Sequence, residues 1–182
     1  MGRVQIELPP TLMKGGFSLR PEVEGDDPFL LELYESTRAA ELAMIADWTA
    51  EQKRMFVAQQ FNAQRLHYRT RLANCLFSVI EHKNEPVGRL YTQETASQLR
   101  IIDIALVPAL RGQGLGMAIL EHLLAEADAA ALPVGLFVEP YNPASRLYRR
   151  LGFLTVAELD FYTEMERPCE DRPVPETAAA VS

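Results

Sequence analysis

The residues best suited to chemistry lie in a glycine-rich turn that follows an apolar segment. Residues 101–107 are dense in Ile, Leu and Val, and Pro108 ends this segment. Residues 111–116 then read Arg-Gly-Gln-Gly-Leu-Gly and lead into a helical pattern. Such a turn aims backbone N–H groups and the positive end of the helix dipole at one anion, and glycine leaves room for its oxygens. The sequence therefore predicts a pyrophosphate site.

Two common nucleotide-binding motifs do not fit this turn. A Walker A loop needs Lys followed by Ser or Thr after its last glycine, whereas Gly114 is followed by Leu115. A Rossmann fingerprint needs Gly or Ala at the position that Met117 occupies. The spacing therefore excludes both of these motifs.

A second segment strengthens the interpretation. Residues 134–138 form a short apolar strand pattern, residues 142–148 read Asn-Pro-Ala-Ser-Arg-Leu-Tyr, and Leu-Gly-Phe follows at 151–153. In this order the two segments resemble motifs A and B of the GNAT N-acetyltransferase superfamily. Arg111, Gly114 and Gly116 match the motif A pattern R/Q-x-x-G-x-G/A. The resemblance covers roughly residues 17–166.

This resemblance implies a fold and a function. The fold would be mixed α/β (α+β), with a largely antiparallel sheet of six to seven strands flanked by about four helices. The function would be direct transfer of an acetyl group from acetyl-CoA to a primary amine of a small molecule or peptide. An O-acetyltransferase or an acyltransferase for longer chains would look the same. The alternative is a non-catalytic acyl-CoA-binding or regulatory module, which would need the glycine turn but not Tyr148.

The resemblance also implies roles for particular residues. The backbone of residues 104–106 would pair with the pantetheine arm like an added strand, and the glycine turn would hold the pyrophosphate. Asn142 would bond the pantetheine or adenosine-side groups, and Tyr148 would protonate the departing thiolate. The implied acyl-CoA residues are Ile104, Ala105, Leu106, Arg111, Gly112, Gln113, Gly114, Leu115, Gly116, Met117 and Asn142.

A general base is less evident from the residues. Asp103 interrupts the apolar strand, and we expect it to point outward on the solvent side. Glu139 is expected to solvate a loop, and loss of the amine proton to water is an equal alternative. For the acceptor we nominate Arg38 and Glu41, which could also form an ordinary i,i+3 pair.

The flanking elements follow from periodicity and capping signals. A helix is expected from Pro28, and Thr49 with Gln52 gives a capping box for a helix over residues 49–68. Residues 76–81 and 87–92 predict an antiparallel hairpin, residues 114–130 a long helix, and residues 155–160 and 161–166 a closing pair of strands. We expect residues 1–16 to be an irregular leader and residues 167–182 a disordered tail.

Composition limits the classes of protein that remain. The length of 182 residues suits one domain, and a net charge of −7 disfavours a nucleic-acid partner. With no apolar run of about 18 residues, we expect no membrane partner and a cytoplasmic protein. Cys75, Cys169 and the three histidines follow no metal-ligand spacing, so we expect no metal. A homodimer is possible by the same resemblance.

Overall fold

Seven strands form one sheet in the order β1-β2-β3-β4-β5-β7-β6 in the computed structural model, which describes residues 4–140 and 142–169. The strands are β1 Phe17–Pro21, β2 Cys75–His82, β3 Glu85–Glu94, β4 Leu99–Leu106, β5 Val134–Val138, β6 Leu154–Glu158 and β7 Thr163–Arg167. All neighbouring pairs are antiparallel except β4 and β5, which are parallel. The expected fold class is therefore confirmed.

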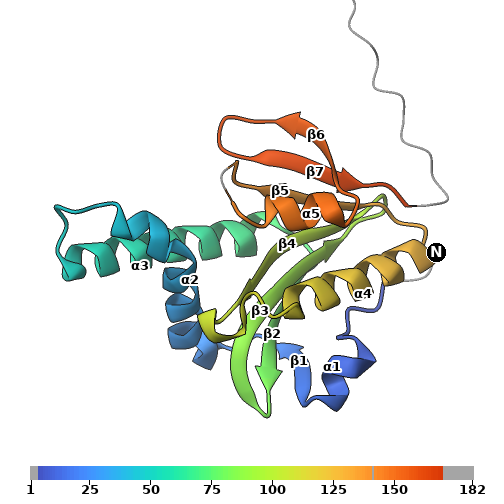
Figure 1. Cartoon of the computed structure of the whole chain (residues 1–182), viewed down its shortest axis with the longest axis horizontal. Helices are drawn as coiled ribbons and strands as arrows, with labels where there is room; N and C mark the ends of the chain where they lie inside the picture. Colours follow the sequence, from blue (N-terminus) through green and yellow to red (C-terminus); the bar gives the residue numbers. More distant parts are fainter. Residues whose placement is uncertain (1–3, 141, 170–182) are drawn as a thin grey trace, which may run out of the picture.

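Helices cover both faces of this sheet. They are α1 Pro10–Lys14, α2 Asp27–Ala43, α3 Ala50–Arg71, α4 Leu115–Ala129 and α5 Ser145–Arg150. Figure 1 shows α4 and α5 in front of the sheet and α3 passing behind it. A core cluster that includes Leu30, Tyr34 and Phe61 joins α2 to α3, and Leu120 and Leu123 of α4 pack on the other face with β4 and β5.

Local signals explain where two of these elements begin and turn. The Thr49 side chain accepts a hydrogen bond from the Gln52 N–H (3.2 Å), and the Gln52 side chain accepts one from the Thr49 N–H (2.8 Å), which confirms the capping box of α3. Between β2 and β3, Lys83 and Asn84 both have positive φ, 53° and 68°. Two such residues form the turn that matches the twist of a β-hairpin, as the sequence predicts.

The expectation of an irregular leader is wrong for residues 10–14, which form α1. Pro10 stands in the first turn, where its fixed φ suits a helix and its missing N–H is not needed. Val4 and Leu8 before it are buried in the core because this segment packs on the same face as α4. Val4 and Leu8 are therefore part of the core, and α1 follows them as an ordered helix without buried residues.

The predicted tail lies mostly outside the described residues, which end at Cys169. Arg167 belongs to β7, and Cys169 is buried. Within the described part of the chain, no helix is both long enough and apolar enough to cross a membrane. No group of three or more His, Cys, Asp or Glu side chains among these same residues could hold a metal ion.

Candidate functional site

The central feature of the site is an opening between β4 and β5. The two strands pair only where Leu99–Ile101 lies beside Val134–Leu136, and both continue beyond this point without pairing to each other. On its other side β4 stays bonded to β3, because Val107 N–H donates to the Val87 carbonyl (2.9 Å) and the register continues to Asp103. Residues 102–106 of β4 therefore have one edge that pairs with no described strand.

Strand alternation decides which peptide groups face this opening. Since Val107 bonds β3, Ala105 two residues earlier also directs its N–H and C=O toward β3. The N–H and C=O groups of Ile104 and Leu106 then point toward the opening. Of the three strand residues nominated from sequence, the register assigns Ile104 and Leu106 to the opening and Ala105 to β3.

The glycine turn lies at the end of the same strand. Gly112 and Gly114 have φ of 71° and 82°, values that side chains rarely adopt, and a Cβ added at either would meet nothing within 4 Å. Gly114 is the N-cap of α4 and offers no capping side chain, and the first bond of the helix ladder runs from Ala118 N–H to the Gly114 carbonyl. The amides of residues 115–117 are thus directed out of the helix end toward open space. This geometry suits a phosphate group.

The side chain of Arg111 steadies the turn. Its Nε donates to the Leu106 carbonyl (2.7 Å), and its guanidinium donates to the Ser36 carbonyl (3.1 Å) and Oγ (2.6 Å) on α2. Removal from water lowers the pKa of Arg111. Gln113 similarly donates to the Ala109 carbonyl (2.5 Å). The side chains of Arg111 and Gln113 are both engaged in hydrogen bonds that hold the loop. The groups of the turn that are left to bind a ligand are therefore its backbone amides.

Tyr148 lies on α5 and packs in the core beside β5. It is 9% exposed, its ring meets Phe153 edge to face at 5.7 Å, and it shares a cluster with Leu136 and Val138. Burial, with a smaller effect of the Asp103 charge, raises the pKa of Tyr148 to about 12. No described residue hydrogen bonds to its hydroxyl, and the raised pKa keeps the phenol protonated near neutral pH.

Asn142 organises the turn before α5. Its Oδ1 accepts a hydrogen bond from Ala144 N–H (2.9 Å), and its carbonyl accepts one from Ser145 N–H (3.0 Å). No residue within 4–140 or 142–169 accepts a hydrogen bond from its side-chain amide nitrogen. The contact of Asn142 with acyl-CoA stays a prediction.

The expectation that Asp103 points into solvent is wrong. The pairing of β3 with β4 shifts by one residue between Tyr91 and Thr92, and such a bulge re-aims the side chains that follow it. Asp103 is only 15% exposed and lies 2.7 Å from Arg89, which is 3% exposed. This partly buried carboxylate is held in an ion pair with a buried guanidinium, so Asp103 is not an unpaired base.

Aromatic residues surround this ion pair. Arg89 lies over the rings of Tyr34 (6.0 Å) and Tyr91 (5.2 Å), and Asp103 acts on the pKa of Tyr68, which burial raises. The sequence interpretation missed Arg89. Its signal was a single arginine in the otherwise apolar strand at residues 87–92.

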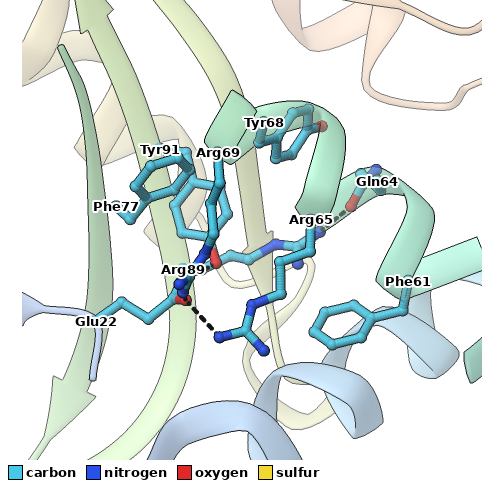
Figure 2. A pocket seen from close by; sticks show the side chains of 9 residues that line it. All are labelled: Glu22, Phe61, Gln64, Arg65, Tyr68, Arg69, Phe77, Arg89 and Tyr91. Atoms are coloured by element: carbon cyan, nitrogen blue, oxygen red, sulfur yellow. Dashed lines mark hydrogen bonds and ion pairs between the residues drawn. The ribbon is translucent and has the colours of Figure 1, made fainter. Parts of the chain in front are cut away.

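A second ionic group lies beneath α3. Figure 2 shows the side chains of Glu22, Arg65 and Arg69 converging there with Tyr91. Glu22 pairs with Arg69 (2.7 Å) and Arg65 (3.5 Å) and accepts a bond from the Tyr91 hydroxyl. The adjoining cavity measures about 10 Å³, room for about one water molecule. It is too small for a substrate.

Arg38 and Glu41, which the sequence nominated as acceptor contacts, form an ion pair with each other. Arg38 makes the expected pair with Glu41 (3.1 Å) and a bidentate pair with Glu139 just after β5 (2.8 and 2.9 Å). Glu139 is therefore an ion-pair partner of α2, contrary to the expected loop-solvating role. Glu41 is 62% exposed.

Comparisons with known proteins agree with this geometry. The model of the Acetyltransferase (GNAT) family matches residues 39–153. Among solved structures, the PaiA N-acetyltransferase from Thermoplasma acidophilum in complex with coenzyme A is 16% identical, with a TM-score of 0.61 over 84% of this chain and 98% of that one. The ribosomal-protein-S18-alanine N-acetyltransferase from Escherichia coli is 19% identical, with a TM-score of 0.55 over 87% and 99%. An acetyltransferase from Thermus thermophilus is 21% identical, with a TM-score of 0.56 over 84% and 96%.

Proposed function

Because the chain belongs to the GNAT acetyltransferase family, we propose that it transfers an acetyl group directly from acetyl-CoA to a primary amine of a small molecule or peptide. The observation that carries this proposal is the alignment of two features. The unpaired edge of β4 leads directly into the glycine turn and the open end of α4. An extended amide-bearing arm that ends in a pyrophosphate fits this path.

The residues present fit acyl-CoA on structural grounds. The outward amides of residues 115–117 and the space beside Gly112 and Gly114 would hold the pyrophosphate. The peptide groups of Ile104 and the N–H of Leu106 would bond the pantetheine arm and the thioester, as in strand addition, whereas the Leu106 carbonyl is already held by Arg111. Acetyl-CoA supplies a thioester, whose carbonyl carbon the amine attacks and whose thiolate leaves.

Two groups of the chain would act on the reacting atoms. Leu106 N–H faces the opening, where it would donate to the thioester oxygen as negative charge develops. Tyr148 lies beside β5 and would give its proton to the thiolate. Because Asp103 is paired with Arg89, we propose that the amine loses its proton to water.

The acceptor would enter from the face covered by α2 and α3. Tyr34, Tyr68 and Asp103 lie there around Arg89, which already pairs with the carboxylate. The net charge of −7 favours a cationic or amine substrate. The Escherichia coli relative acts on an alanine of a ribosomal protein, so a peptide amine belongs in the test panel.

Titration calorimetry with acetyl-CoA, coenzyme A and NADH tests the binding step, and thiol release against a panel of amines tests transfer. We expect acetyl-CoA and coenzyme A to bind in the micromolar range, NADH not to bind, and one class of amine to accelerate thiol release. Binding without release by any small or peptide amine would favour a non-catalytic acyl-CoA-binding module. Absence of binding by folded protein would overturn the proposal.

A further inference from the structure

Helix α2 is attached to both walls of the opening by residues two positions apart. On the β4 side, Ser36 accepts from Arg111, whose Nε also holds the Leu106 carbonyl. On the β5 side, Arg38 binds Glu139 through two parallel hydrogen bonds of 2.8 and 2.9 Å. One turn of one helix is therefore bonded to Arg111, which holds the end of β4, and to Glu139, which directly follows β5.

The β5 wall needs such an attachment. Its pairing with β4 ends at Leu136, and beyond that residue β7, on the far side, is the one described strand that pairs with it. Val138 is the last residue of the strand, and Glu139 follows immediately. Among the described residues, the Arg38–Glu139 pair is the ionic contact that ties this end of β5 back across the opening.

The helix side of this attachment is fixed as well. The Ser36 hydroxyl donates to the Leu33 carbonyl (2.6 Å) while it accepts from Arg111. Arg38 lies over the ring of Tyr34 (5.5 Å), which is buried. A bidentate arginine–carboxylate pair has one preferred geometry, so it fixes distance as well as charge.

We propose that α2 is a brace that holds the β4 and β5 walls at the separation which the pantetheine arm requires, with Arg38 and Glu139 as positioning residues. This proposal rests on the proposed function. Arg38 then acts on acyl-CoA through Glu139, not by contact with the acceptor. Without the pair, the end of β5 occupies positions in which one wall cannot bond the arm, and the apparent dissociation constant rises as the competent fraction falls.

The test measures acetyl-CoA affinity by calorimetry and thermal stability for Arg38→Ala, Glu139→Ala, the double variant, and the exchange Arg38→Glu with Glu139→Arg. We expect each single change to raise the Kd for acetyl-CoA about tenfold, the loss typical of a charge-assisted bond. The double variant should lose no more than a single one, since the pair acts as a unit. The exchange should restore most of the affinity.

The matched control is Asp128→Ala. Asp128 on α4 holds Arg167 on β7 by the same bidentate geometry, with distances of 2.7 and 2.8 Å, away from the opening. We expect a comparable loss of thermal stability and an unchanged Kd. Ser36→Ala removes one hydroxyl bond on the β4 side and should weaken binding about twofold to tenfold.

The outcomes separate the brace from the proposed function. If the unchanged protein binds acetyl-CoA and both single variants bind it equally well, the brace is wrong and the function stands. An increase in the acceptor KM for Arg38→Ala alone, with no change for Glu139→Ala, would also overturn the brace, because it would mark Arg38 as an acceptor contact. If the unchanged protein does not bind acetyl-CoA, the proposed function itself fails.

Discussion

At the scale of single residues, Tyr148 combines a buried ring with a hydroxyl that makes no hydrogen bond to any described residue. With a pKa of about 12 it keeps its proton at any pH at which the protein would work. Tyr148→Phe should therefore leave the Kd for acetyl-CoA unchanged and lower kcat about 100-fold, the usual range for a lost general acid. Calorimetry and steady-state thiol release check the two halves of this prediction. An unchanged kcat would assign Tyr148 to packing alone.

The raised pKa values of three tyrosines predict how the free energy of unfolding depends on pH. Burial raises the pKa of Tyr68, Tyr91 and Tyr148 in the folded chain above the value of about 10 that holds in the unfolded chain. Above about pH 10 the unfolded chain therefore loses protons that the folded chain keeps, and the free energy of unfolding falls as pH rises. Below that pH these groups contribute no slope.

Urea denaturation at pH 9 and pH 11 measures this slope. Tyr148→Phe should make the fall smaller, because one ionising group is removed from the unfolded state. Equal slopes for the two proteins would contradict the raised pKa of Tyr148.

At the scale of elements, the turn before α4 works through its backbone, so the space beside Gly114 matters more than any side chain. Gly114→Trp places a ring where phosphate oxygens would lie and forces a side chain into φ of 82°. We expect acetyl-CoA binding to be lost in calorimetry. Gly16→Ala, at φ of 87° before β1, imposes the same backbone strain away from the turn and should keep its affinity.

Strands β3 and β4 carry an ion pair between Arg89, which is buried, and Asp103, which is partly buried. Arg89→Leu would leave the carboxylate buried without a partner, and we expect a loss of about 3–5 kcal/mol of stability. Arg89→Leu combined with Asp103→Leu removes both charges and should recover most of that loss. Chemical denaturation compares the two variants, and a double variant less stable than the single one would contradict this account.

At the scale of the whole molecule, the helices form two layers, one on each face of the sheet, and each layer contains different residues of the proposed site. The layer with α4 and α5 contains the open helix end and Tyr148, while the layer with α2 and α3 carries the ion pairs and aromatic rings of the proposed acceptor face. The part of the sheet where β4 and β5 do not pair lies between these two layers. A donor and an acceptor approaching from opposite faces would meet there.

Sequence patterns determined most of the elements and the glycine turn before α4. The hairpin of β2 and β3, the capping box of α3 and the span of β5 follow from local periodicity, turn residues and side-chain caps, which involve neighbours within a few positions. The glycine turn is likewise local, because its chemistry depends on backbone freedom at residues 112–114. These features could be predicted without knowledge of what packs against them.

Tertiary structure decided what depends on residues far apart in the chain. The bulge that turns Asp103 to Arg89, the end of β4–β5 pairing at Ile101, and the Arg38–Glu139 pair all depend on strand register or on contacts between separate elements. The leader was misjudged for the same reason, since Val4 and Leu8 acquire a core only when the sheet and α4 are in place. Periodicity reports which face of an element is apolar, whereas long-range packing selects the partner that covers it.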